Sequence, residues 1–173
     1  PHLTTRRQRQ MCIRDRKDGV LIKCDPIQVF CGNNTANGNP DLKWLGADSA
    51  NYYNSYDVKS DHGWGELMEL IEKIHFDFEN LGEILNIDRV LWAFAVNSAI
   101  LNLDTYNGYY VHNYYLYRTE DGLFQMIPWD FDNSFAGAIL GWDYFDPMAV
   151  YNYDTYGNQY APNERPLLEK LLD

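Results

Sequence analysis

The sequence contains few cysteines and no long apolar run. Its three cysteines, Cys12, Cys24 and Cys31, show no CxxC spacing and no accompanying histidine cluster, which argues against a structural zinc site. Cys24 and Cys31 could pair in an exported protein, and free thiols are an equally good interpretation. No apolar stretch reaches the roughly 18 residues that a membrane-spanning helix needs. The sequence therefore predicts neither a zinc-stabilised fold nor a membrane span.

Cationic side chains are also scarce, and they are unevenly distributed. The chain has 14 Lys and Arg residues against 25 Asp and Glu residues, a formal net charge of -11. Residues 1–17 hold six of the cations and one acid, so they carry +5 and the remainder carries -16. A surface this acidic repels phosphate backbones, so we expect no nucleic-acid partner. It suits a cationic protein substrate or a site that collects divalent metal ions.

The two ends of the sequence set the expected domain boundaries. The opening PHLTTRRQRQMCIRDR has no hydrophobic periodicity and no helix caps, and MCIRDR resembles a translated sequencing adapter, so we interpret residues 1–17 as a non-native or disordered leader. The closing ERPLLEKLLD begins an amphipathic helix that stops after about two turns. Residues 18–173 are long enough for one domain with a sizeable core, and we expect that domain to be cut at both ends.

The first half of this domain shows a strand, a loop and a helix in turn. Residues 18–25 are a short apolar run between turn residues, which predicts a strand. Residues 31–48 are rich in Asn and Gly and predict a loop, and residues 52–61 predict an extended segment. Apolar residues at helical spacing in residues 63–75 predict an amphipathic helix.

The second half predicts a helix followed by a β-hairpin. Residues 90–103 are apolar nearly all round, so we expect a central helix buried on every side, with Asn86 or Asp88 as its N-cap. The Tyr-rich residues 112–118 and the residues 123–128 predict two strands joined by the tight turn TEDG. Together these patterns predict the α+β class.

Two acidic residues directly follow the hairpin, in the stretch PWDFDNSF. If this stretch is extended, Asp130 and Asp132 share one face and their carboxylates repel each other unless a cation lies between them. The pair could cap turns, could act as acid and base in a glycoside hydrolase, or could hold Mg²⁺ together with phosphate oxygens. Taken alone, DFDNS favours the capping role, which is the commonest one for Asp beside Asn and Ser.

The order of elements favours the metal site. A buried helix ends in a loop that begins with Asp104, an Asn follows, and a hairpin then leads to Asp130. Protein kinases arrange the same parts in this order, with the loop Asp orienting the attacking hydroxyl and the later Asp holding the metal. The order therefore predicts phosphoryl transfer, which depends on positioning and charge neutralisation more than on covalent chemistry.

The stretch LNLDTYNGYYVHNYYLYRTEDGLFQMIPWDFDNSF also resembles the core of the spore coat protein H (CotH-like) kinases. In that family an Asp-containing loop precedes HN-x-x-LY, a hairpin and PWD-x-D, and GVLIKC, YDVKS, VLWAFAVN and RPLLEKLLD agree as well. The resemblance covers about residue 18 to the end. It implies an atypical protein-kinase-like fold, here mainly the C-terminal catalytic and metal-binding lobe.

The resemblance also implies an activity and a set of site residues. The implied activity is ATP-dependent transfer of phosphate, with Mg²⁺ or Mn²⁺, to Ser hydroxyls of partner proteins at the spore surface or outside the cell. Asp104 matches the catalytic Asp, Asn113 and Asp130 match residues that bind the nucleotide and metal, and Asp132 is a further metal ligand candidate. Trp129 and His112 match motif positions, and we expect Trp129 to pack and His112 to orient a neighbour by hydrogen bonding.

Several features depart from ordinary protein kinases. The interval from Asp104 to Asn113 exceeds the usual spacing of about five residues, so Asn107 is a rival for the position of Asn113. The residues after PWDFD read NSFAG, so activation-loop behaviour is not expected. No glycine-rich loop and no V-A-I-K lysine is present, and Lys23 beside a strand is ordinarily a surface residue. An isolated fragment of this kind can be inactive.

Two other classes of function stay open at this point. The Tyr-rich stretches, including YNYDTYGNQY, could belong to a surface adhesin or carbohydrate-binding module without catalysis, although half-buried β-surfaces have the same composition. Asp104 and Asp130 could also be the acid and base of a glycoside hydrolase.

Overall fold

A computed structural model describes residues 19–26, 38–108, 110–136 and 165–172 of the protein. The expected leader, Cys12, Cys31 and the YNYDTYGNQY stretch lie outside these residues. The described elements are, in chain order, β1 (Val20–Cys24), η1 (Ser49–Tyr52), β2 (Tyr56–Val58), α2 (Trp64–Phe76), η2 (Phe78–Glu83), α3 (Ile87–Ala99), β3 (Tyr114–Arg118), β4 (Phe124–Pro128), η3 (Ser134–Ala136) and α6 (Pro166–Leu172). The α+β class predicted from the sequence is confirmed.

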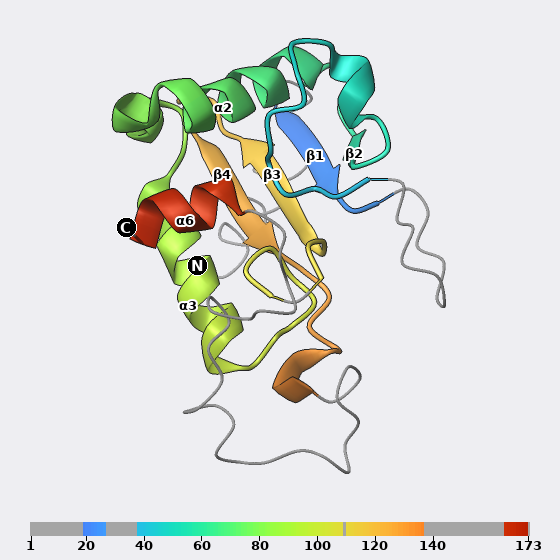
Figure 1. The fold of residues 1–173 in the computed structure, drawn as a ribbon, viewed down its shortest axis with the longest axis vertical. Helices are drawn as coiled ribbons and strands as arrows, with labels where there is room; N and C mark the ends of the chain where they lie inside the picture. Colours follow the sequence, from blue (N-terminus) through green and yellow to red (C-terminus); the bar gives the residue numbers. More distant parts are fainter. Residues whose placement is uncertain (1–18, 27–37, 109, 137–164, 173) are drawn as a thin grey trace, which may run out of the picture.

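The four strands form one antiparallel sheet in the order β2-β1-β3-β4 (Figure 1). Strands β1, β3 and β4 lie where the hydrophobic patterns predict them, and the TEDG turn joins the hairpin. The expected extended segment at residues 52–61 is only partly a strand, because η1 ends at Tyr52 and β2 is confined to Tyr56–Val58. Residues 38–48, the described part of the expected loop, contain no helix or strand.

One face of the sheet packs against the helices and forms the core. Alternate side chains on the strands point to this face because successive residues of a strand point to opposite sides. The buried ones are Val20, Ile22, Cys24, Tyr114, Leu116, Phe124 and Met126. Helix α2 covers them with the four residues of its predicted apolar face, which are Leu67, Leu70, Ile71 and Ile74. Helix α6 packs near α2, where Lys170 Nζ donates to the Ile74 carbonyl at 2.7 Å.

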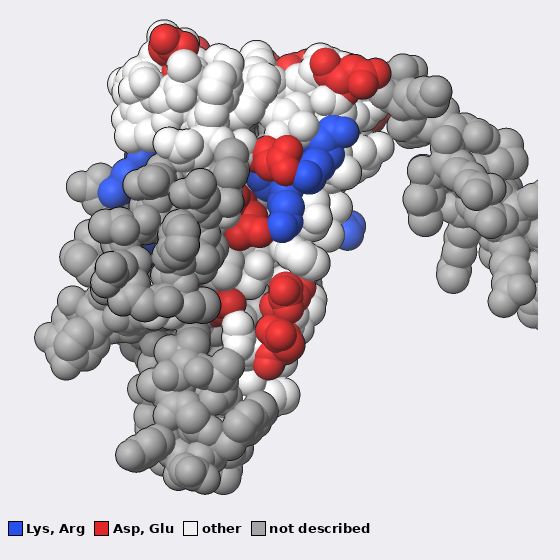
Figure 2. All heavy atoms as spheres, turned by 90° about the vertical axis from the view of Figure 1, so that its right-hand side faces the viewer, with Lys and Arg blue, Asp and Glu red and all other residues white. Residues whose placement is uncertain are grey.

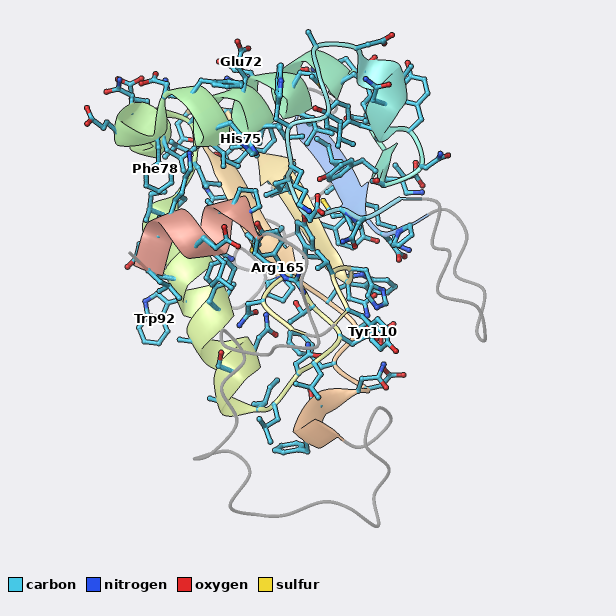
Figure 3. All side chains as sticks on the ribbon, viewed as in Figure 1. Glu72, His75, Phe78, Trp92, Tyr110 and Arg165 are labelled. Carbon is cyan, nitrogen blue, oxygen red and sulfur yellow. The ribbon has the colours of Figure 1, made fainter. Side chains whose placement is uncertain are left out.

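Helix α3 differs from its prediction in burial and length. Its N-cap is Asn86, whose side chain accepts a hydrogen bond from the Arg89 amide at 3.1 Å. Asn86 is one of the two N-caps that the sequence predicted. The helix ends at Ala99, and it is not buried on every side: Trp92 is 65% exposed and Val96 is 45% exposed. The helix lies beside β4 at the edge of the sheet, and Trp92 points away from the fold (Figures 1 and 3). Only the face turned toward the sheet and the following loop is therefore covered.

This one-sided burial predicts different costs for two aromatic truncations on the same helix. Phe94 is 5% exposed and stacks on Tyr106, so Phe94→Ala should lower the free energy of unfolding by about 3–5 kcal/mol. Trp92→Ala should lower it by less than about 1 kcal/mol because Trp92 is largely exposed. Urea unfolding of both variants measures the difference, and equal losses would contradict the one-sided packing of α3.

Candidate functional site

The loop that follows α3 is buried although much of it is polar. Residues 101–108 are all buried, and side-chain amides supply partners for their polar groups. Asn97, in the last turns of α3, donates to Thr105 Oγ1 at 3.2 Å. Asn102 donates to Asn97 Oδ1 and accepts from the Asp104 amide, both at 3.2 Å. This network fixes the backbone at Asp104 because the Asp104 amide and the Asn97 and Asn102 side chains have defined partners, whereas the buried Asn107 Oδ1 has none among the described residues.

Packing from the other side holds the same loop. Tyr106 stacks on Phe94 with ring centroids 5.6 Å apart, and its hydroxyl donates to the Asp41 carbonyl at 3.1 Å. Arg165, at the start of α6, donates to the Gly108 carbonyl at 2.6 Å and points toward this loop (Figure 3). A Cβ at Gly108 would collide with the Leu103 carbonyl, so the turn requires glycine there.

Asn107, the rival for the position of Asn113, faces the helix. Its Nδ2 donates to the Phe94 carbonyl at 3.2 Å and to Ser98 Oγ at 3.1 Å. Asn113 instead donates to Asp104 Oδ2 at 3.1 Å. The side chain of Asn113 therefore contacts Asp104, whereas the side chain of Asn107 contacts helix α3.

The carboxylate of Asp104 is the meeting point of three segments. His112 Nε2 contacts its Oδ1, while Asn113 Nδ2 and Asn133 Nδ2 donate to its Oδ2 at 3.1 and 2.6 Å. His112 and Asn113 come from the start of β3, and Asn133 comes from the turn after β4. His112 therefore has the orienting contact that the sequence predicts. The sequence reasoning missed Asn133, although it directly follows Asp132.

The stretch after β4 is not extended, so the condition under which Asp130 and Asp132 would share a strand face is not met. Asp130 has φ 56°, in the left-handed region, and a turn follows in which the Ser134 amide donates to the Phe131 carbonyl at 3.1 Å. The side chains of Asp130 and Asp132 nevertheless lie close enough for Asp132 to raise the pKa of Asp130. A local bend, rather than the alternation of a strand, brings the pair together.

The electrostatics of this pair favour a cation. Burial raises the pKa of Asp130, and the hydrogen bond and negative charge of Asp132 raise it further. Asp104 adds a smaller repulsion of the same sign. A divalent cation would relieve this repulsion.

Asp130 and Asp132 suit a metal ion that takes its remaining ligands from water and phosphate. Among the described residues, no group of three or more His, Cys, Asp and Glu side chains is arranged to hold a metal ion. Mg²⁺ is commonly held by one or two carboxylates together with waters and phosphate oxygens, and Asp130 and Asp132 supply that number. The side-chain amide nitrogen of Asn113 donates to Asp104, so the side-chain oxygen, Oδ1, is the atom of this amide that can act as a metal ligand.

Strand β1 adds two charged residues that sequence reasoning did not place in the site. Asp25 Oδ1 lies 3.4 Å from His112 Nδ1, and Asp25 Oδ2 lies 2.5 Å from Lys23 Nζ. The Lys23 ammonium also lies 4.8 Å from the centre of the Trp129 ring, which packs edge-on against Tyr115 as a packing residue would. No sequence signal identified Asp25, because its place depends on the pairing of β1 with β3.

The contacts of His112 and Asp25 shift both of their pKa values. Burial alone would lower the pKa of His112, but hydrogen bonds to Asp104 and Asp25 raise it to about 9. Burial alone would raise the pKa of Asp25, but hydrogen bonds from His112 and Lys23 hold it below its ordinary value. The site therefore favours a charged imidazolium between two carboxylates.

The raised pKa of His112 predicts a pH-dependent stability. An unfolded His has a pKa of about 6.5, so the native state binds this proton more tightly. The resulting stabilisation is complete below about pH 6.5 and is lost as the pH rises through about 9. Urea unfolding should show that the free energy of unfolding of the parent chain declines across this pH window, and that the His112→Gln protein lacks this decline. Parallel pH profiles for the two proteins would contradict the assignment.

Comparison with known proteins agrees with this arrangement. A family model described as CotH kinase protein matches residues 6–173, which include the loop, the hairpin and the turn described above. No curated protein and no solved structure matches the chain in the corresponding searches. The family match covers nearly all of the sequence and confirms the resemblance drawn from HNYYLY and PWDFD. The chain belongs to the CotH kinase protein family.

Proposed function

We propose that the protein transfers the γ-phosphoryl group of ATP to Ser hydroxyls of partner proteins, with Mg²⁺ or Mn²⁺. One observation carries the proposal: Asn133 donates to Asp104 at 2.6 Å, so the loop that holds Asp104 is joined directly to the turn that holds Asp130 and Asp132. A candidate base and a candidate cation site thereby belong to one cluster. This is the pairing that phosphoryl transfer requires.

Each residue has a distinct role in this mechanism. Asp104 orients the acceptor hydroxyl and takes its proton as the oxygen attacks the γ-phosphorus and the bond to the β-phosphate oxygen breaks. The carboxylates of Asp130 and Asp132, with the side-chain oxygen Oδ1 of Asn113, would hold the cation. The cation supplies neutralisation of phosphate charge. The fixed hydrogen bonds of Asp104 keep its carboxylate in one orientation before the substrate arrives.

The order of elements supports a kinase-like C-terminal lobe. Helix α3, the Asp104 loop, the β3–β4 hairpin and the Asp130 turn follow one another as the corresponding parts of protein kinases do. The rigid hairpin then fixes the distance between the two carboxylate-bearing segments. We propose this fold from the element order and the family.

The charge of the chain supports a cationic substrate segment. The face seen in Figure 2, on the side of β1 and β2, carries a patch of acidic side chains below a band of mixed charge. A Ser flanked by Lys or Arg would be attracted to such a surface. None of the described helices is long and apolar enough to cross a bilayer. We propose a spore-surface or extracellular location from the family alone.

Metal-dependent nucleotide binding is the first test. Calorimetric titration should show ATP binding only with Mg²⁺ or Mn²⁺, and Asp130→Asn should abolish it because one of the two paired carboxylates is lost. Asp121→Asn, in the exposed hairpin turn, is the matched control and should bind as the parent does. ATP binding without metal would count against the proposed metal-dependent kinase, and sugar binding without metal would favour the adhesin.

Loss of the proposed base is the second test. Asp104→Asn should reduce phosphate transfer from ATP to a Ser-containing basic protein by about 100-fold or more, with ATP affinity retained. Asp61→Asn, an exposed substitution beyond β2, should transfer at the parent rate. Thermal unfolding of both variants checks that they fold. A folded Asp104→Asn protein with full activity would exclude Asp104 as the base.

A further inference from the structure

We propose that Asp25 is a positioning residue, which holds His112 and through it Asp104 in the orientation used for phosphoryl transfer. The inference rests on the proposed function, because positioning of Asp104 matters only if Asp104 acts on a hydroxyl. It assigns a role in the site to Asp25, the residue directly after β1, which the kinase-like order of elements does not include.

The imidazole of His112 is held at both ends. Its Nε2 contacts Asp104 Oδ1, and its Nδ1 lies 3.4 Å from Asp25 Oδ1. A protonated imidazole carries a hydrogen on each ring nitrogen, so both carboxylates attract it, Asp104 at Nε2 and Asp25 as an ion pair at Nδ1. A ring that turned away from Asp25 would give up one of the two contacts. Asp25 therefore fixes the ring that faces Asp104.

Lys23 holds Asp25 in turn. Its ammonium lies 2.5 Å from Asp25 Oδ2, the oxygen that does not face His112. The same ammonium lies over the Trp129 ring, one residue before Asp130. The side chains of Lys23, Asp25 and His112 are each about one-fifth exposed, so solvent screens this chain of charges only in part.

Strand pairing explains why these groups meet. In the β1–β3 ladder Lys23 lies opposite Tyr115, and Cys24 lies opposite Tyr114. Asp25 is the next residue along β1, and the corresponding direction on β3 leads to Asn113 and His112. The register therefore directs Asp25 to the segment that contacts Asp104, and a shift of one residue would turn it to the other face.

One of the two carboxylate oxygens of Asp104 is held by His112, which Asp25 in turn holds. Asn113 and Asn133 both donate to Oδ2, while Oδ1 has the contact with His112. If Asp25 is removed, His112 is held at one end only and Oδ1 loses its fixed donor. The expected effect is on the chemical step, because Asp25 has no direct contact with the Asp130–Asp132 pair among the described interactions.

Kinetics of matched variants of the full chain test this role. Asp25→Ala should lower kcat for transfer to a basic Ser-containing protein by about 10- to 100-fold and leave KM for ATP unchanged. Asp25→Asn, which keeps an acceptor oxygen, should recover part of that loss. Asp61→Ala, at an exposed acid beyond β2, is the control and should behave as the parent does. An unchanged kcat in a folded Asp25→Ala protein, or a change confined to KM for ATP, overturns the proposal.

Nuclear magnetic resonance of the ¹⁵N-labelled histidine rings separates this proposal from the proposed function. The two ring N–H signals of His112, assigned by their loss in His112→Gln, should both be protected from solvent exchange in the parent chain. Asp25→Ala should abolish protection at Nδ1 and leave Nε2 protected. Unchanged protection at Nδ1 overturns the positioning role whatever the activity. A parent chain that shows both signals but transfers no phosphate with either metal overturns the proposed function and leaves the Asp25–His112 contact established.

Discussion

The antiparallel pairing of β1 with β3 is the interaction on which the rest of the structure depends. It joins a strand near the start of the described chain to the hairpin that follows the Asp104 loop. Without it, β3 and β4 would be an isolated hairpin, which is at best marginally stable in water. The same pairing completes the buried face against which α2 packs, and it brings Lys23 and Asp25 to His112. Stability and the site thus depend on one set of backbone hydrogen bonds.

The site collects negative charge and compensates it unevenly. Asp104 has a histidine and two amide donors, and Asp25 has Lys23 and His112. Asp130 has instead the carboxylate of Asp132 as its neighbour, which raises its pKa. The compensated acids are those for which positioning is proposed, and the uncompensated pair is the one for which a cation is proposed. The difference in environment gives chemically identical side chains different roles.

Two residues of the site have a left-handed backbone conformation. Asn113 and Asp130 both have φ 56°, a region that most residues avoid and that Asn and Asp tolerate better than other non-glycine residues. One begins the hairpin and the other follows its end, and the Trp129 amide donates to the Asn113 carbonyl at 3.1 Å between them. The bend at Asn113 accompanies its side-chain contact with Asp104, and the bend at Asp130 begins the turn that carries Asn133 to the same carboxylate.

The sequence by itself determined the local elements and much of the candidate site. Tyr-rich composition and the TEDG turn predicted β3 and β4, helical spacing predicted α2, and Asn86 was one of two predicted caps of α3, because these features depend on neighbours within a few residues. Asp104, Asn113, Asp130 and Asp132 were also predicted as site residues, from the order of loop, hairpin and turn along the chain and from the family resemblance.

Only the tertiary structure decided which segments meet. The apolar residues of α3 could not show that one side of the helix lies open, because burial depends on what the rest of the chain places beside it. Asn133 and Asp25 carried no signal of their own, since a turn and a strand pairing bring them to Asp104 and His112. Residues distant in sequence become neighbours through strand pairing and packing, and a local pattern does not encode those contacts.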